Sequence, residues 1–353
     1  MSVFITLLIF LGMLALLILV HELGHFFAAR LSKVKVEELG LGFPPRVLKY
    51  KRGETLYSLN LIPLGGFCKM AGETDPNIPG SLASKSVKAR LFVLGSGALM
   101  NAILPIVLFS IAFMIPTHID VGDVKVTEVA AESPAALAGI MPGDTIIELD
   151  GHKVENIRDY SYYTQLKLGT QITVVFEREG VQNTGSMVPR WKPPEGEGAT
   201  GVVLELTNIT TVSRSQPFWR AVPKAGTQIW ETMLLFKNEV ERWIIAKDAP
   251  QVTGPVGLAQ LTGQVAQGGV GVFLQFMAFI SINLAIVNLL PIPALDGGRM
   301  LFVGIEGIRR GKKISPQREA LIHFIGFVVI IIGILAISYQ DIVRLIRGGS
   351  LGP

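Results

Sequence analysis

Hydrophobic residues along this chain gather into four long runs that are separated by polar segments. The runs cover residues 3–29, 91–116, 270–291 and 321–340, and the first has no charged side chain between Val3 and Val20. About 20 apolar residues in a helix are enough to cross the hydrocarbon core of a bilayer. The pattern therefore predicts a polytopic α-helical membrane protein with four transmembrane helices.

Composition and charge agree with this prediction and add an orientation. The chain is 49% hydrophobic and only 17% charged, too apolar for an ordinary soluble domain of 353 residues. Residues 30–90 contain eleven Lys or Arg and residues 297–320 contain six, whereas residues 117–269 contain thirteen in a much longer span. Basic loops stay in the cytoplasm. We therefore expect residues 30–90 and 292–320 inside, with residues 117–269, both termini and the tail at 341–353 outside. The net charge of +4 then needs no nucleic-acid partner.

The first cytoplasmic segment has the signature of a β-hairpin. A short strand containing Gly40 and Gly42 is followed by alternating apolar and polar residues at positions 57–61, the period of a half-buried strand. Pro63, Gly65 and Gly66 then predict a turn before a return strand. This hairpin is either membrane-associated, lining a cavity in the protein, or an ordinary surface hairpin; the residues favour neither.

The long external segment divides into two parts. Residues 117–208 predict a small α+β domain, with strands at 124–129 and 145–150, a helix from the N-cap Asn156 to Leu168, and a strand at 171–179. Residues 209–269 contain an amphipathic helix at 224–246 and a linker. The apolar face of this helix suits a membrane surface or the external domain, and core packing is equally compatible with its pattern.

The first hydrophobic run carries the candidate chemistry. His21 and His25 are four residues apart, so both imidazoles lie on one helix face and can reach one zinc ion. Glu22 between them is placed to act as the general base on a zinc-bound water. Polar residues at membrane depth are costly and are functional by default. The alternative is a helix end whose polar side chains meet lipid headgroups.

Asp296 is the candidate third zinc ligand. It follows the third hydrophobic run, where Pro291 and Pro293 end the helix and Gly297 and Gly298 allow a tight turn or a close backbone approach. In the predicted topology, Asp296 lies at the same membrane depth as the two histidines. Taken alone it could equally be a helix-capping aspartate.

These motifs together resemble the site-2 proteases, which are zinc intramembrane metalloproteases, and most closely their bacterial regulator-of-sigma-E protease branch. The similarity extends over nearly the whole chain. Besides His21 to His25, it includes the pattern Asn-x-x-Pro-x-Pro-x-Leu-Asp-Gly that begins at Asn288, and a Gly97-x-x-x-Asn101 motif in the second helix. It also includes the hairpin and an external PDZ-like domain, of which the sequence has room for one.

The resemblance implies specific roles. It implies one zinc ion bound by His21, His25 and Asp296, with Glu22 as the catalytic acid and base. The implied substrate-binding residues are Gly40, Gly42, Gly65, Gly66, Asn101, Asn283 and Asn288, with the hairpin offering an edge strand to an unwound substrate.

It also implies a setting. The implied location is a bacterial cytoplasmic (inner) membrane. The implied substrates are single-pass membrane proteins, either anti-sigma factors already trimmed outside by another protease or leftover signal peptides. The PDZ-like domain would either capture a peptide terminus or restrict access by size.

One alternative function comes from another class: a membrane scaffold or chaperone that keeps zinc for structure and holds partners through the PDZ-like domain. Structural zinc sites usually have four protein ligands and no adjacent base. Three candidate ligands beside Glu22 therefore favour the protease. The single cysteine, Cys68, cannot form an intrachain disulfide, and we expect it to be inert packing.

Overall fold

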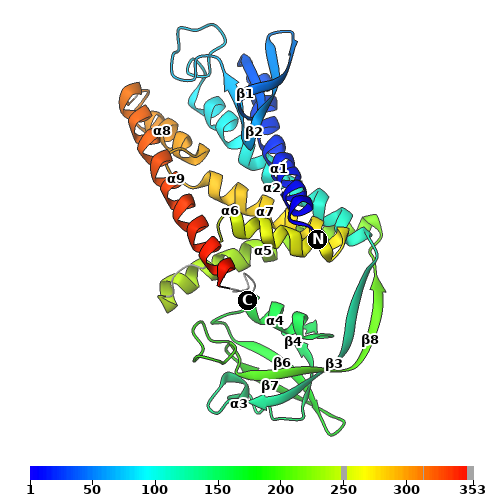
Figure 1. The fold of residues 1–353 in the computed structure, drawn as a ribbon. Coiled ribbons are helices and arrows are strands. Elements are labelled where there is room, and N and C mark those ends of the chain that lie inside the picture. The colour runs from blue at the N-terminus through cyan, green and yellow to red at the C-terminus, as the bar shows by residue number, and fades with distance from the viewer. Residues whose placement is uncertain (248–252, 313, 348–353) are drawn as a thin grey trace. The chain divides into compact units, whose positions relative to one another are not determined.

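The computed structural model describes residues 1–247, 253–312 and 314–347. The chain divides into two compact units (Figure 1). The first, here called the membrane unit, combines Met1–Ala112 with Val252–Pro353, and the second, the inserted unit, is Phe113–Gln251. Each unit is described by itself.

The membrane unit contains the four predicted spans, and this prediction is confirmed. They are α1 (Val3–Leu31), α2 (Val87–Met114), α7 (Val270–Leu289) and α9 (Pro316–Ile346), each long and apolar enough to cross a membrane. In α9 only Asp341 is buried. An apolar helix that buries almost nothing within its own protein is stable when lipid surrounds it, so the exposed faces of α9 suit contact with acyl chains.

Helices α1 and α2 approach each other closely at Gly24. A Cβ atom there would lie 2.8 Å from the carbonyl carbon of Ser96, so any larger residue would push the two helices apart. Small residues allow such close contacts between membrane helices. Near this crossing, Phe26 and Ala29 of α1 pack with Val93 and Leu94 of α2 in one buried cluster. This packing fixes the position of α1 against α2 beside the site described below.

Two helices of the membrane unit were not predicted, α6 (Pro255–Gln267) and α8 (Asp296–Ile308). Helix α6 is tied to α9 because the buried carboxylate of Asp341 accepts a hydrogen bond from the backbone N–H of Gly257 at 2.9 Å. Helix α8 contributes Val303 to the buried cluster of α1 and α2. The segment at 292–320, which we predicted to carry the third zinc ligand, thus contains a helix.

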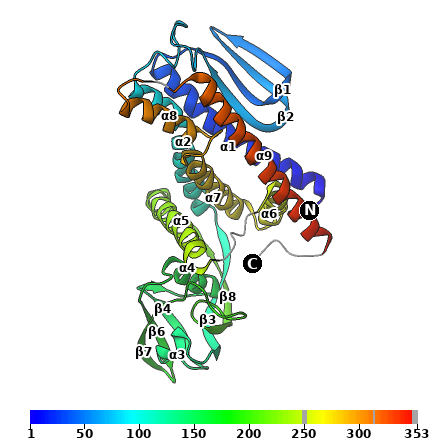
Figure 2. The same cartoon turned by 90° about the vertical axis from the view of Figure 1, so that its left-hand side faces the viewer.

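Strands β1 (Val36–Arg52) and β2 (Thr55–Met70) form the predicted hairpin, but each strand is long and bent. Residues 36–41 pair on one side with residues 56–59 and on the other with residues 66–70. Figures 1 and 2 show this sheet beside α1, and β2 is the strand with more contacts to that helix. The hairpin is therefore a small curled sheet of four segments, with residues 36–41 in its interior.

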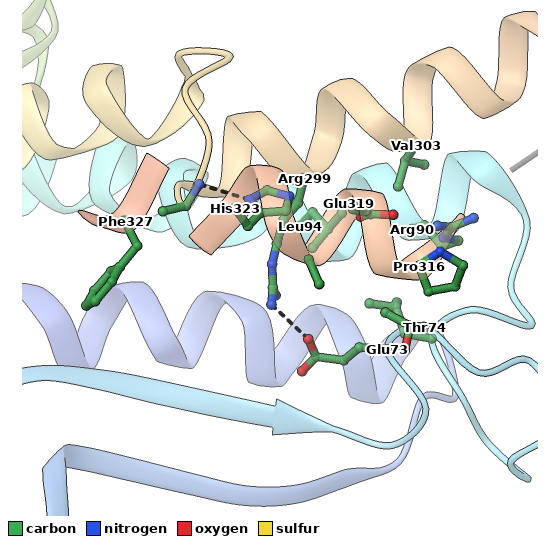
Figure 3. A pocket seen from close by; sticks show the side chains of 13 residues that line it. Glu73, Thr74, Arg90, Leu94, Arg299, Val303, Pro316, Glu319, His323 and Phe327 are labelled. Carbon is green, nitrogen blue, oxygen red and sulfur yellow. Dashed lines mark hydrogen bonds and ion pairs between the residues drawn. The ribbon is translucent and has the colours of Figure 1, made fainter. Parts of the chain in front are cut away.

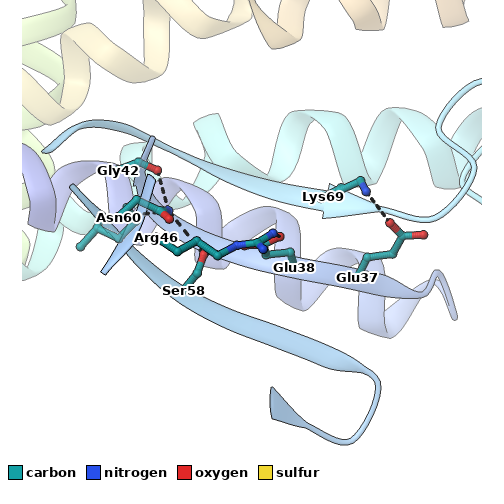
Figure 4. A network of polar contacts seen from close by, with 8 residues as sticks. Glu37, Glu38, Gly42, Arg46, Ser58, Asn60 and Lys69 are labelled. Carbon is teal, nitrogen blue, oxygen red and sulfur yellow. Dashed lines mark hydrogen bonds and ion pairs between the residues drawn. The ribbon is translucent and has the colours of Figure 1, made fainter. Parts of the chain in front are cut away.

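A polar network lies inside this sheet (Figure 4). The buried Glu38 carboxylate accepts two hydrogen bonds from Arg46, at 3.0 and 2.7 Å, and one from the Ser58 hydroxyl at 2.7 Å. Burial alone would raise the pKa of Glu38, but the hydrogen bonds from Arg46 and Ser58 outweigh it and hold the pKa below its ordinary value. Asn60 donates to the Gly42 carbonyl at 3.0 Å, so the network fixes the backbone where β1 bends.

The inserted unit is an α+β fold. Its strands are β3 (Thr117–Val129), β4 (Thr145–Leu149), β5 (His152–Lys153), β6 (Ile172–Arg178), β7 (Val181–Met187) and β8 (Val202–Arg214), in the sheet order β7-β6-β4-β3-β8 with β5 paired to β4. Its helices are α3 (Pro134–Leu137), α4 (Ile157–Leu166) and α5 (Phe218–Ala246). The predicted strands at 124–129, 145–150 and 171–179 are confirmed as β3, β4 and β6. Asn156 caps α4 as predicted, since its side chain accepts from the Asp159 N–H at 2.9 Å.

Helix α5 begins six residues earlier than predicted and buries an unexpected face. Its contacts with α4 are polar: Asn238 donates to the carbonyls of Gln165 and Leu166, and Glu231 accepts from the Tyr162 hydroxyl at 2.7 Å. Of the apolar face predicted for this helix, Met233 is 46% exposed and Ile229, Phe236, Val240 and Trp243 are half-buried, so none of the five is fully buried. Core packing of that face is therefore not observed.

Candidate metal centre

Three potential ligand atoms converge at the membrane unit's α1. His21 Nε2 lies 3.0 Å from Asp296 Oδ2, His25 Nε2 lies 3.2 Å from the same oxygen, and the two Nε2 atoms are 3.2 Å apart. His25 is buried, while His21 and Asp296 are largely so. The structure thus brings together all three residues that the sequence predicted as zinc ligands, although Asp296 is 271 residues beyond His25.

Hydrogen bonding to His25 leaves the correct nitrogen free for a metal. His25 Nδ1 lies 2.9 Å from the backbone carbonyl oxygen of Val93, which can only accept. Nδ1 therefore carries the proton, and Nε2 keeps its lone pair and points toward Asp296. Carbonyl groups that orient histidines in this way are common around metal sites. Sequence reasoning missed this contact because a backbone carbonyl leaves no signature in the residue pattern.

The donor set fits zinc. Two ligand atoms about 2.1 Å from a tetrahedral zinc ion lie about 3.4 Å from each other, close to the separations of 3.0–3.2 Å found here. Two imidazole nitrogens and one carboxylate oxygen make a typical catalytic set, which leaves a fourth position open. The geometry therefore suits a catalytic zinc better than a closed structural one.

Gly97 of α2 makes room for the two histidines. A Cβ atom at this position would lie 2.6 Å from His21 Nε2, and the Nε2 of His25 would be closer still. Any side chain at residue 97 would therefore displace the imidazoles. The sequence marked Gly97 as part of a motif, but only the structure shows that its hydrogen atom faces the metal ligands.

Asp296 is the first residue of α8 rather than the end of α7. The residue at the N-cap is Leu295, without a side-chain capping bond, so Asp296 does not act as a helix cap. Gly297 lets the start of α8 pack against the end of α7, since a Cβ there would lie 2.5 Å from the Leu289 carbonyl oxygen. Gly298 packs in the same way against Ile292. Their role is close backbone approach, one of the two possibilities that the sequence left open.

The segment before Asp296 is also held from α9 (Figure 3). His323 Nδ1 accepts a hydrogen bond from the Ala294 N–H at 2.9 Å. Both residues border a cavity of about 350 Å³. Arg299 of α8 borders it too and pairs with Glu73 at 3.1 Å, as the dashed line in Figure 3 shows. His323 therefore supports the segment that carries Asp296.

Glu22 lies next to His21 on α1, beside the free edge of the β1–β2 sheet. A Cβ atom on Gly66 would lie 3.1 Å from the Glu22 Cγ, so β2 passes directly over the glutamate.

Cys68, two residues beyond Gly66 in β2, is buried. Burial, together with the charges of Glu22 and Glu73, raises the pKa of its thiol to about 12. A thiol that stays protonated is no nucleophile, which agrees with an inert packing role.

The other predicted substrate residues lie in different settings. Gly40 is paired on both sides, with Phe67 and Ser58, so it is not at an open sheet edge. Asn101 is only 1% exposed, and its backbone carbonyl accepts from the Ser281 hydroxyl, which places it in the packing of α2 against α7. Asn283 donates to the Phe279 carbonyl on its own helix at 2.9 Å. Asn288 is half-buried near the end of α7.

Comparison with known proteins identifies the family of this site. The family model described as Peptidase family M50 matches residues 9–333, which includes both histidines and Asp296. The chain belongs to peptidase family M50. It is therefore a metalloprotease of the site-2 protease family and an integral membrane protein.

Relatives of this M50 protease support the same assignment. The zinc metalloprotease RasP of Oceanobacillus iheyensis is 28% identical over 430 residues, which cover 96% of this chain and 99% of that protein. RasP of Geobacillus kaustophilus is 27% identical and covers 92% of this chain and 95% of its own length. A protein of Clostridium acetobutylicum, provisionally named a zinc metalloprotease, is 34% identical over 333 residues, 93% of this chain and 94% of that protein.

Among solved structures, similarity is found to a PDZ domain of an SdrC-like protein from Listeria monocytogenes. It is 22% identical, covers 23% of this chain and 85% of that domain, and has a TM-score of 0.21.

Proposed function

We propose that this M50 protease is an intramembrane endopeptidase that cuts single-pass transmembrane proteins, as in regulated intramembrane proteolysis. The observation that carries the proposal is the meeting of His21, His25 and Asp296 beside Glu22, where the histidines and the glutamate belong to a helix long enough to span the bilayer. Ionisable groups at such a depth are costly unless they serve a function. Anti-sigma factors and leftover signal peptides are the proposed substrate types.

In this proposal the trio holds one zinc ion per chain. When bound, zinc supplies Lewis acidity to the scissile carbonyl and to the attacking water. Glu22 takes a proton from that water and passes it to the leaving amine, since it is the carboxylate next to the ligands that is not itself placed among them. The Val93 carbonyl keeps His25 in the tautomer that leaves Nε2 free.

Substrate binding by strand addition is the second part of the proposal. A transmembrane helix has its carbonyls tied in internal hydrogen bonds, so cleavage requires local unwinding. The free edge of β2 at Gly65 and Gly66 passes over Glu22 and can pair with an unwound segment. In this arrangement Gly40 and Gly42 lie in the interior of the sheet and do not pair with the substrate. Asn283 and Asn288 contact the extended substrate from α7.

The setting follows from charge and exposure. The basic residues at 30–90 and 297–320 support a cytoplasmic side for the metal centre, with both termini and the inserted unit outside. The similarity to bacterial M50 proteases supports a bacterial inner membrane as the location. The inserted unit is PDZ-like in this proposal and either binds a terminus or excludes untrimmed substrates. The apolar face of α5, which is half-buried except for the exposed Met233, then rests on the membrane surface.

Cleavage of a single-pass substrate, with its external domain already trimmed, tests the proposal in liposomes. Wild type is compared with Glu22→Gln, which keeps the size of the side chain but cannot accept the proton. Cleavage by wild type alone, with equal zinc in both proteins, is expected. Equal cleavage by both proteins would assign the activity to a contaminant. Absence of cleavage by either, with zinc bound, would leave an unsuitable substrate and a non-proteolytic scaffold to be separated next.

A further inference from the structure

A second concave site lies at the end of α1, away from the metal centre. Its volume is about 1070 Å³. The walls come from three parts of the membrane unit: the last turns of α1, the loop into β1, and the tip between β1 and β2, with Pro79 and Gly80 closing one side. Neither the proposed hydrolysis nor the proposed substrate strand uses it.

The walls of this site are strongly cationic. Arg30, Lys33, Lys35 and Arg52 line it together with only one acid, Glu54, which pairs with Lys35 at 3.4 Å. Among the residues that the structure describes, Lys33 and Arg52 have no carboxylate partner. Four cations from separate segments facing one acid leave an excess of positive charge. Such a site attracts an anion.

Arg30 is held in place rather than free. Its guanidinium donates to the Thr55 hydroxyl at 3.3 Å and lies 5.2 Å from the centre of the Phe26 ring. Neither contact neutralises its charge. The Arg30 guanidinium is therefore held in one orientation and keeps its positive charge. A guanidinium held in this way can donate paired hydrogen bonds to a phosphate.

The depth of the site matches the lipid headgroups. Helix α1 has 29 residues and is about 43 Å long, whereas the hydrocarbon core is about 30 Å thick. Its last turns therefore extend into the headgroup layer. Phe27, which lines the site, is 53% exposed, and Leu31, one helical turn further along α1, is 75% exposed. Both offer apolar surface that an acyl chain can cover. A soluble anion would make no use of this surface.

We propose that this site binds the phosphodiester headgroup of an anionic membrane lipid. Arg30, Lys33 and Arg52 bind the phosphate, and the acyl chains lie along Phe27 and Leu31. A bound headgroup ties the tip of the β1–β2 sheet to the end of α1. Since β2 also passes over Glu22, lipid binding at this site steadies the sheet that covers the metal centre.

The test uses the full-length protein in detergent and measures its affinity for short-chain phosphatidylglycerol, phosphatidylcholine and inorganic phosphate. Lys33→Gln with Arg52→Gln removes two cations and leaves Arg30 and its structural contacts intact. Each cation near a membrane surface contributes about 1 kcal/mol, or about fivefold, so the double variant should bind phosphatidylglycerol about 25-fold more weakly. Lys51→Gln with Lys88→Gln, two exposed lysines outside the site, is the matched control and should bind as wild type does.

Three results would overturn the proposal. Equal weakening in the control double variant would show general surface electrostatics, and equal binding of phosphatidylcholine would show that charge is not recognised. Inorganic phosphate binding as tightly as the lipid would assign the site to a free anion. Zinc content, measured in all variants, should be unchanged, since these residues lie outside the metal centre.

Discussion

His323 of α9 accepts a hydrogen bond from the backbone N–H of Ala294, two residues before the candidate zinc ligand Asp296. Ala294 has a φ of +77°, in the left-handed region that a residue with a Cβ rarely adopts. The bond therefore holds a strained backbone, and the neighbouring Pro293 packs against Gly326 of the same helix. Through these contacts α9 sets the position of the segment that delivers Asp296.

Replacing His323 tests this support. His323→Leu keeps the approximate size but removes the acceptor, leaving the Ala294 N–H without its partner. A hydrogen bond of this kind contributes about 0.5–1.5 kcal/mol, so we expect zinc affinity to fall by up to roughly tenfold. Competition with a chromophoric chelator measures it. His118→Leu, a histidine of the inserted unit, is the control, and an unchanged affinity in His323→Leu would show that Asp296 is placed without α9.

Gly97→Ala should disrupt the metal centre from α2, the helix that packs against the two histidines. The new methyl group would collide with both imidazoles, because its carbon would lie 2.6 Å from His21 Nε2. We expect loss of most bound zinc and of proteolysis, measured by metal analysis and substrate cleavage. Gly95→Ala on the same helix meets only the flexible end of Met300, at 3.3 Å, and should keep both.

Removal of one of the three proposed zinc ligands should lower zinc affinity, whereas removal of a histidine outside the metal centre should not. Replacement of residues that merely orient a metal ligand typically costs 10–100-fold in affinity, so His25→Ala or Asp296→Ala should cost more than about 100-fold. Metal analysis after dialysis checks this. His152→Ala, a substitution outside the trio, should retain zinc fully; zinc retained in both ligand variants would disprove the assignment.

The pair Asp144–Arg178 makes the inserted unit sensitive to acid. Burial of Asp144 favours its neutral form, but hydrogen bonds from Arg178 and the Met141 N–H outweigh this and lower the pKa. The stabilisation is therefore complete above the ordinary aspartate pKa and is lost as pH falls through the lowered one. In Arg178→Gln, acid unfolding should begin at higher pH, measured by hydrogen exchange in β4 and β6.

The N-cap of α4 offers a local test of stability. Asn156→Ala removes the side-chain acceptor of the Asp159 N–H and should lower the unfolding free energy of the inserted unit by about 1 kcal/mol. Hydrogen exchange of α4 amides reports the change. Asn156→Ser restores an acceptor and should recover most of it; identical exchange in both variants would mean that the cap contributes nothing.

The sequence predicted the parts of this protein whose pattern is local. Long charge-free runs specify the four spans, and a spacing of four residues specifies the histidine pair, because helical geometry alone connects them. Helix α8 escaped notice because its start, Asp296-Gly297-Gly298, is typical of a turn. Strand β7 is polar and lies at a sheet edge, so it lacks the alternation of a half-buried strand. The double pairing of Gly40 depends on how the sheet curls, which no local pattern encodes.

The contrast between Gly24 and Ala294 has a consequence for metal release. Two of the three donors sit on α1, which packs tightly against α2 at Gly24, whereas the third follows a separate, strained segment that α9 contacts. The two imidazoles thus share one rigid support, while the carboxylate beside them depends on a second. We therefore expect a bound ion to be released through opening of the aspartate segment rather than through separation of the histidines.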